Sequence, residues 1–265
     1  MEYELVKLDI QDDIALITLN DPKVLNAISL KMLEEMKQAI TEAGGPDNNV
    51  RCLVITGAGR GFCAGANLTA PRTGTDTGEV PLAGQGLDET YNPLLLMLKN
   101  FKAPIITAVN GPAAGIGMSV ALMGDMVLAS RSAFFLQAFR RIGLIPDGGS
   151  TYILPRMIGQ ARAMELSLLG ERLPAEKALE WGLINRVYDD DQLMPEAMNL
   201  ARELASGPTL SLSLIRRAYW ESSDNTYEEQ LHLEAVLQAE AGASEDAREG
   251  AEAFRQKRPP RFKGK

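Results

Sequence analysis

The chain has 265 residues, enough for one large α/β domain or for one domain with an appendage. Hydrophobic residues make up 45% and charged residues 23%, an ordinary globular balance that argues against extensive disorder. The net charge of −8 argues against nonspecific nucleic-acid binding, because such binding depends on Lys and Arg neutralising phosphates.

The first predicted elements are two strands, a helix and a third strand. Apolar and polar side chains roughly alternate over residues 3–10 and 14–19, which predicts a β-hairpin around the intervening Gln-Asp-Asp. Ser29 is placed to cap a helix that runs to about Ala43, where a Gly-Gly-Pro sequence ends it. The apolar run at residues 51–56 predicts a buried strand.

Strands and helices alternate through the middle of the chain. A stretch rich in Gly, Thr and Pro at residues 69–89 predicts a surface loop. Strand–helix–strand connections are right-handed crossovers, so the alternation that follows predicts parallel βαβ units. The expected order is helix, strand, helix, strand and strand, at residues 91–100, 105–109, 115–123, 126–129 and 134–137.

The sequence becomes mostly helical from about Gln160. A helix is expected to start at Leu173, and one more short strand is expected at residues 183–188. Four helices follow, of which the last are amphipathic and acidic, so they must pack on the core or on another subunit. These helices are expected near residues 193–206, 208–220, 227–241 and 244–257. We therefore expect a core over residues 1–200 and a helical region over residues 201–265.

Cysteine and histidine offer little chemistry here. Cys52 lies in an apolar run and Cys63 in a Gly-flanked turn, without metal-ligand spacing, so both are expected to be reduced thiols. The single histidine, His232, lies in a polar helical stretch, which argues against a Ser-His-Asp triad and against a His-rich metal site. No apolar run resembles a signal peptide or a transmembrane helix, so we expect a cytoplasmic protein without a membrane partner.

Two Gly-rich turns follow consecutive predicted strands. Cys63–Ala66 reads Cys-Ala-Gly-Ala, and Ala114–Gly117 reads Ala-Gly-Ile-Gly. Backbone N–H groups aimed at one point stabilise a developing oxyanion, so a matched pair of such turns favours a catalytic site. The alternative is that glycine only permits tight packing. Neither a G-x-G-x-x-G dinucleotide pattern nor a phosphate-binding Gly-Lys-Ser/Thr sequence is present.

Asp147 is the candidate acid of the sequence. It follows the apolar run Ile142–Pro146 and precedes Gly148 and Gly149. A carboxyl held against apolar walls has a raised pKa and can act as a general base or acid. The alternative is that Asp147 caps the helix that begins near Gly149.

These residues, in this order, resemble the crotonase (enoyl-CoA hydratase/isomerase) superfamily over essentially the whole chain. The resemblance is carried by LNDPKVLNAIS, FCAGANL, APIITAVNGPAAGIG, GLIPDGGSTYILPRMIG, LGERLPAEKALEWGLINRV and EGAEAFRQKRPPRFKGK. It implies an α/β spiral of ββα units with a C-terminal helical trimerisation region, in a homotrimer or a dimer of trimers. It also implies an acyl-CoA thioester substrate and no metal or redox cofactor, since coenzyme A is part of the substrate.

The resemblance places the oxyanion hole at the N–H groups of Ala66 and Ile116, although Ile116 stands where relatives usually have the middle glycine of three. It places coenzyme A along two stretches and at one C-terminal lysine that could belong to a neighbouring subunit: Lys23, Leu25, Ala27, Ala64, Ala66, Asn67, Leu68 and Lys257. An acyl pocket is expected around Phe139, Met97 and Phe135. The alternatives are that the lysines are ordinary surface charges and that these apolar residues are only core.

Both glutamates of true hydratases are missing. Ser119 stands at the first glutamate position and Phe139 at the second, and neither side chain is a suitable base near neutral pH. Asp147 instead coincides with the acid of isomerases in the superfamily, and its context most resembles the ring-1,2-epoxyphenylacetyl-CoA isomerase branch. The sequence therefore predicts double-bond or ring isomerisation by an oxyanion hole and one aspartate.

Four alternatives to this prediction remain open at the level of sequence. The chain could be an enoyl-CoA hydratase, or an acyl-CoA-binding scaffold with little catalysis. It could also be a thioesterase or dehalogenase in which Asp147 is the nucleophile. An RNA-binding side role, known for one branch, fits poorly with the net charge of −8.

Overall fold

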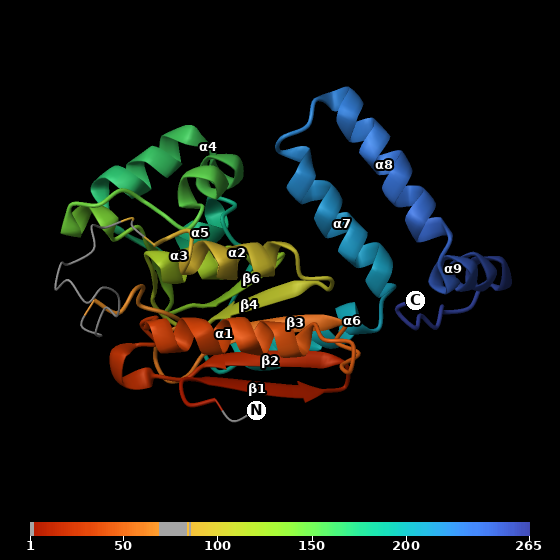
Figure 1. Cartoon of the computed structure of the whole chain (residues 1–265), viewed down its shortest axis with the longest axis horizontal. Coiled ribbons are helices and arrows are strands. Elements are labelled where there is room, and N and C mark those ends of the chain that lie inside the picture. Colours follow the sequence, from red (N-terminus) through yellow and green to blue (C-terminus); the bar gives the residue numbers. More distant parts are fainter. Residues whose placement is uncertain (1–2, 69–83, 85) are drawn as a thin grey trace.

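The computed structural model describes residues 3–68, 84 and 86–265. A six-stranded sheet runs through the molecule in the order β1-β2-β3-β4-β6-β9 (Figure 1). Its strands are β1 (Val6–Gln11), β2 (Ile14–Leu19), β3 (Cys52–Gly57), β4 (Ile105–Val109), β6 (Met126–Ser130) and β9 (Arg186–Tyr188). β1 and β2 form the predicted antiparallel hairpin, and every later pairing in this sheet is parallel. The predicted α/β class is therefore confirmed.

Both faces of the sheet are buried. Along β3, Leu53 and Ile55 face one apolar cluster, whereas Cys52 and Val54 face a second one. The first cluster lies under α1 (Leu30–Ala43), α2 (Tyr91–Lys99) and α3 (Ile116–Ala121), and the second under α6 (Leu193–Ala205). Strands buried on both faces read as continuous apolar runs, which is why the sequence made β3 and β4 easy to predict.

The first helix starts where its cap predicts. The Oγ of Ser29 accepts a hydrogen bond from the backbone N–H of Met32 at 3.2 Å, as an N-cap serine should. Glu35, in contrast, is nearly buried and accepts hydrogen bonds from the backbone N–H groups of Leu5 and Val6, at 2.7 and 3.1 Å. This glutamate therefore joins α1 to the entry of β1.

A second, three-stranded sheet in the order β5-β7-β8 was not predicted in full. It contains β5 (Ala113–Ala114), β7 (Phe134–Leu136) and β8 (Arg172–Pro174). The helix expected to start at Leu173 begins two residues later, as α5 (Ala175–Glu180), because β8 pairs antiparallel with β7. β9 is likewise shorter than the predicted strand at residues 183–188.

The helical part of the chain begins earlier than expected. α4 (Ser150–Leu169) starts ten residues before Gln160 and is kinked at Gly159, where φ is 78°. Most of the loop predicted at residues 69–89 lies outside the described residues, and residues 86–90 form turns.

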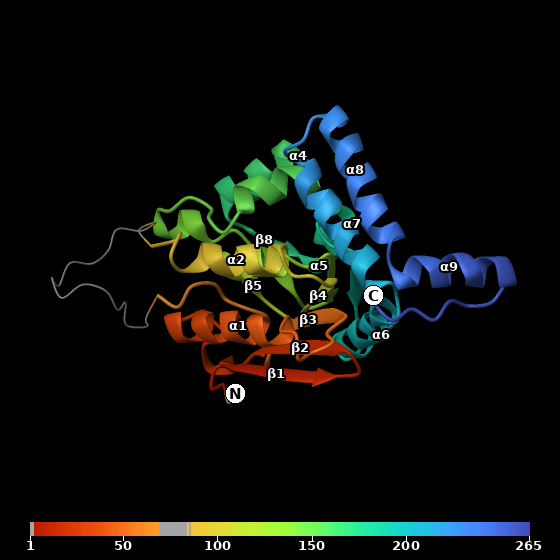
Figure 2. The ribbon, with the colours of Figure 1, turned by 45° about the vertical axis from the view of Figure 1, so that its right-hand side comes forward.

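The last three helices extend to one side of the sheet (Figures 1 and 2). They are α7 (Thr209–Ser222), α8 (Tyr227–Gly242) and α9 (Glu245–Gln256), close to the predicted ranges. Large apolar side chains on them remain exposed: Ile215, Tyr219, Tyr227, Leu231, Val236 and Phe254. The predicted division at residue 200 falls inside α6, whose Ala201 and Ala205 still pack on the sheet. Trimerisation through this region stays a prediction.

A buried arginine anchors α7 to the core. The guanidinium of Arg216 forms an ion pair with Asp125, with 2.5 Å between Nε and Oδ2. It also donates hydrogen bonds to the backbone carbonyls of Phe101 and Leu98. Since a buried charge needs several partners, this set of contacts fixes where the helical region leaves the core.

Candidate active site

The first site segment is a left-handed turn after β2. Leu25 and Asn26 have φ values of 54° and 57°, and Asn26 is fully buried. The Oδ1 of Asn26 accepts a hydrogen bond from the N–H of Asp21, while its Nδ2 donates to three carbonyls of the loop after β3: those of Ala58, Gly61 and Phe62. Asn26 therefore ties the turn to that loop. In the sequence, the only hint of this role is the residue type, because asparagine tolerates the left-handed conformation better than most residues.

The two predicted Gly-rich turns lie against each other. The N–H of Cys63 donates to the carbonyl of Pro112, and the N–H of Ala114 donates to the carbonyl of Cys63. At Gly65 the backbone has a φ of 105°, and a Cβ there would lie 3.0 Å from the carbonyl oxygen of Ala114. Glycine is thus required at this crossing, and the turns that were matched in sequence meet in space.

Two backbone N–H groups at these turns have no acceptor in the described part of the chain. Ile116 is the first residue of α3, so its N–H has no partner within the helix. Ala66 is exposed, and its bridge to Ile28 uses the carbonyl of Gly65 and the N–H of Asn67. Both predicted oxyanion-hole residues therefore have a backbone N–H without an acceptor among the described residues, and their role as an oxyanion hole stays a prediction.

Asp147 is half-buried in the turn that precedes α4. Its Oδ1 is buried without a hydrogen-bond partner among the described residues, and desolvation by burial raises the pKa of its carboxyl. The N-cap residue of α4 is Gly149, and no side chain caps that helix. The alternative interpretation of Asp147 as a helix cap is therefore wrong, and a proton-transfer role remains.

Gly148 places the Asp147 turn directly on α3. Its φ is 60°, and a Cβ at this position would lie 2.5 Å from Cδ1 of Ile116 and 2.8 Å from Oγ of Ser119. Distances this short are never found for real Cβ atoms, so only glycine lets the turn come so close. The acid predicted from one motif therefore lies next to the helix that begins with Ile116.

Ser119 and Phe139, the two positions that the resemblance aligns with the glutamates of true hydratases, are both buried. The Oγ of Ser119 lies 3.0 Å from the Oγ of Ser150 and 3.4 Å from the carbonyl oxygen of Asp147. Phe139 has its ring against Gly115, where a Cβ would lie 3.7 Å from Cζ of the ring. Neither position supplies a carboxylate to the site.

The other predicted acyl-pocket residues lie in or beside the core. Phe135 is fully buried in the first apolar cluster, and Met97 packs against that cluster. Both positions are those expected if Phe135 and Met97 are core residues, the alternative to a role in an acyl pocket. Phe139 lies against Gly115 of the second Gly-rich turn.

The predicted coenzyme A residues lie at two places. Lys23, in the short helix η1 (Pro22–Val24), is exposed, and Leu25 accepts through its carbonyl a hydrogen bond from the N–H of Ala64. Leu25, Ala27, Ala64 and Asn67 are partly exposed, and Ala66 and Leu68 are exposed. Lys257 is the C-cap residue of α9, and α9 lies well away from α4 in both views (Figures 1 and 2).

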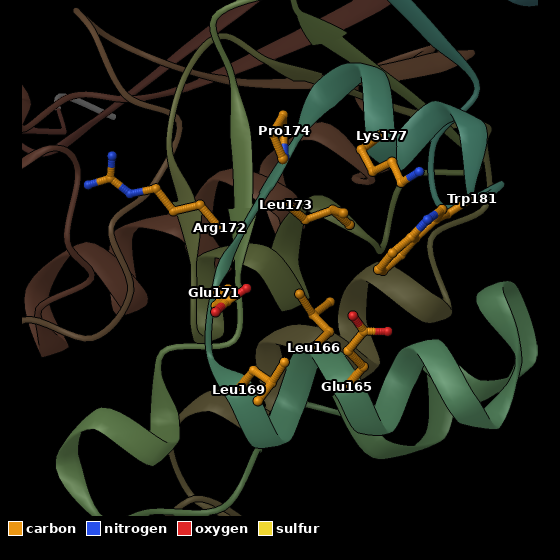
Figure 3. A pocket seen from close by; sticks show the side chains of 9 residues that line it. All are labelled: Glu165, Leu166, Leu169, Glu171, Arg172, Leu173, Pro174, Lys177 and Trp181. Atoms are coloured by element: carbon orange, nitrogen blue, oxygen red, sulfur yellow. The ribbon is translucent and has the colours of Figure 1, made fainter.

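A pocket of about 180 Å³ lies elsewhere on the surface (Figure 3). Leu166 from α4, Leu173 from β8, and Lys177 and Trp181 at α5 are among its lining residues. The side chain of Arg172 extends away from the others in Figure 3. Asp147 and the Gly-rich turns do not line this pocket, so it is separate from the candidate site.

Other reactive side chains contribute little to this site. Burial raises the pKa of both Cys52 and Cys63 to about 12, which keeps these thiols protonated at neutral pH. His232 is exposed on α8. Within the described ranges, no cluster of His, Cys, Asp and Glu side chains could hold a metal ion. None of the helices described here is both long and apolar enough to cross a bilayer.

Comparisons with known proteins show the family of the chain. Residues 9–265 match the family model described as enoyl-CoA hydratase/isomerase. The chain belongs to the enoyl-CoA hydratase/isomerase family. The 1,2-epoxyphenylacetyl-CoA isomerase of Escherichia coli K12 is 46% identical over 99% of both chains. A probable enoyl-CoA hydratase of Rhodobacter capsulatus is 41% identical over the full length of both.

Solved structures of the family share the whole fold. The enoyl-CoA hydratase subunit I of Geobacillus kaustophilus HTA426 has a TM-score of 0.91 and 35% identity, with full coverage of both chains. The enoyl-CoA hydratase of Bacillus anthracis has a TM-score of 0.90 and 30% identity, over 99% of this chain and all of the other. The chain is thus an enzyme of this family, an isomerase or a hydratase, for which an acyl-CoA thioester is the expected substrate.

Proposed function

We propose that this enoyl-CoA hydratase/isomerase family member is an acyl-CoA isomerase that moves a double bond or opens a ring with a single acid, Asp147. The observation that carries the proposal is the half-buried carboxyl of Asp147, unpartnered at Oδ1, on a turn that packs against Ile116. Water addition needs groups that hold and deprotonate water, and Ser119 and Phe139 do not supply them.

The thioester carbonyl would bind between the N–H groups of Ala66 and Ile116. These two donors polarise the carbonyl and stabilise the enolate oxygen by several kcal/mol, about 3 to 4 for each donor where similar sites have been tested. The carboxylate of Asp147 takes a proton from the α- or γ-carbon of the acyl group. It then returns this proton to another carbon of the same group, so the reaction consumes no water and needs no second acid.

The remaining predicted contacts follow the same arrangement. Lys23 and the exposed backbone around Leu25, Ala27, Ala64 and Leu68 would contact coenzyme A. Phe139 would border the acyl group beside Gly115. Lys257 would reach coenzyme A from a neighbouring subunit of a trimer, because α9, which it caps, lies well away from α4 of its own chain.

A panel of CoA esters tests the proposal. The protein would be incubated with 3-enoyl, 2-enoyl, dienoyl and ring-epoxide aromatic CoA esters, and ultraviolet spectra would report conjugation. Exchange of α- and γ-protons in heavy water would report enolisation. We expect Asp147→Asn to lower turnover by about 100- to 10,000-fold and to leave thioester binding nearly unchanged. Retained turnover in this variant would refute the assignment of Asp147.

Enoyl-CoA hydration is the second candidate, because one relative with 41% identity is a probable enoyl-CoA hydratase. Crotonyl-CoA separates the two reactions, since hydration removes its conjugated absorbance and adds water. Hydration faster than every isomerisation in the panel would favour the hydratase. Tight binding without turnover of any ester would instead favour a binding protein.

A further inference from the structure

Three buried polar side chains connect α3, the residue after β7, and α4 next to the Asp147 turn. The Nε2 of Gln137 lies 3.2 Å from the Oγ of Ser150, and that Oγ lies 3.0 Å from the Oγ of Ser119. The Oγ of Ser119 in turn lies 3.4 Å from the carbonyl oxygen of Asp147. Gln137, Ser119 and Ser150 are each no more than 1% exposed.

The chemistry of these groups gives the chain one direction. The amide nitrogen of Gln137 can only donate, so Ser150 accepts from it. Ser119 donates its O–H to the carbonyl of Asp147, and a hydroxyl carries one hydrogen, so Ser150 is the donor between the two serines. That carbonyl also accepts a hydrogen bond from the N–H of Ser150 at 3.1 Å. Two donors therefore converge on the main chain of Asp147.

The carboxyl of Asp147 has no comparable support. No hydrogen bond of the described residues involves it, and its Oδ1 is buried without a partner. The direction in which the carboxyl points thus depends on how its own peptide is held. The peptide is held by the two donors and by Gly148, which packs against Ile116 and Ser119.

We propose that Ser119, Ser150 and Gln137 are positioning residues, whose chain of hydrogen bonds sets the orientation of the Asp147 carboxyl relative to the oxyanion-hole helix. The proposal rests on the proposed function, in which Asp147 transfers the proton. The Oε1 of Gln137 is buried without a partner, and leaving such an oxygen unpaired costs about 1 to 3 kcal/mol. The Nε2 of Gln137 also lies 3.2 Å from the Sδ of Met118, a weak acceptor, so the hydroxyl of Ser150 is the stronger of the two acceptors of this amide.

The experiment removes one hydroxyl at a time. Ser119→Ala and Ser150→Ala break the chain. Ser130→Ala is the matched control, because Ser130 is equally buried but lies in β6, where its hydroxyl interacts with Ser132 and Asp190 and with no residue of this chain of hydrogen bonds. The readouts are kcat and KM for the best CoA ester of the panel, the pH profile of kcat, and the thermal unfolding of each variant. Binding of butanoyl-CoA, which cannot isomerise, reports the intactness of the site.

We expect Ser119→Ala and Ser150→Ala to lower kcat by about 10- to 100-fold, with KM and butanoyl-CoA binding within about twofold, since a misplaced reacting group has this effect. In the pH profile of kcat, the acidic limb of both variants should move to lower pH. A looser turn lets water reach the carboxyl of Asp147, which reduces the desolvation that raises its pKa. The double variant should lose little more than either single variant, since both break one chain. Ser130→Ala should leave kcat, KM, the pH profile and butanoyl-CoA binding unchanged.

The proposal is overturned if either folded variant matches Ser130→Ala in kcat and in pH profile, or if only KM changes. It is also overturned if the losses in kcat add fully in the double variant. Failure of the proposed function looks different, because Asp147→Asn would then keep its turnover whatever the serine variants do.

Discussion

Replacing Gly148 with alanine tests how closely the Asp147 turn must approach α3. A Cβ there would lie 2.5 Å from Cδ1 of Ile116 and 2.8 Å from Oγ of Ser119. Carbon atoms in contact are separated by about 3.5 Å or more, so the turn must move by about 1 Å, or Ile116 must leave its rotamer. Overpacking of this kind costs about 1 to 3 kcal/mol, and the left-handed φ adds about 1 to 2 kcal/mol.

Gly149→Ala provides the matched control. Gly149 is also left-handed, with a φ of 77°, but the nearest atom to its Cβ would be Cδ1 of Ile153 at an ordinary 3.8 Å. The control therefore includes the left-handed penalty of about 1 to 2 kcal/mol without the clash. We expect Gly148→Ala to unfold in urea with about 1 to 3 kcal/mol less stability than Gly149→Ala.

Activity should separate the two variants further. A displacement of about 1 Å at a reacting group costs about 100-fold in rate, so Gly148→Ala should lose kcat to this extent while Gly149→Ala loses little. Ile116→Val removes Cδ1 and keeps the backbone N–H, so it should partly restore the Gly148→Ala variant. Equal stability and equal kcat of the two alanine variants would refute the close packing of the turn on α3.

Two further predictions concern the acid and the turn that supports the loop after β3. Because burial raises the pKa of Asp147 above its ordinary value of 3.8, kcat should fall with decreasing pH at a higher pH than for an exposed carboxyl. An acid with a raised folded-state pKa binds protons more tightly when folded, so its ionised form opposes folding at neutral pH, and Asp147→Asn should unfold at an equal or higher temperature. A pH profile without that shift, or a lower melting temperature, would count against the burial of this carboxyl. Asn26→Ala should destabilise the fold by about 2 to 4 kcal/mol in urea, because it leaves buried carbonyls unpaired and places alanine at a φ of 57°. Asn26→Gly avoids the left-handed strain and should lose less; equal losses would show that the hydrogen bonds of the amide dominate.

Much of the fold could be predicted from the sequence because local patterns and tertiary burial agree there. The apolar runs of β3 and β4 reflect a sheet buried on both faces, and Ser29 caps α1 as its side chain chemistry requires. β8 lacked such a pattern, because its three residues are extended only through pairing with β7, more than thirty residues earlier in the chain. Short strands of this kind carry too little periodicity to be recognised before their partners are known.

The sequence by itself determined which groups the site can use: one acid after an apolar run, two glycine turns after strands, and Ser119 and Phe139 at the positions that the resemblance assigns to the glutamates of true hydratases. The tertiary structure alone decided how these groups meet. Gly148 in contact with Ile116, and the serine chain on the carbonyl of Asp147, join segments about thirty residues apart. Such contacts depend on the packing of α3 against the turn before α4. The residue pattern within either segment carries no information on how close the two segments come in space.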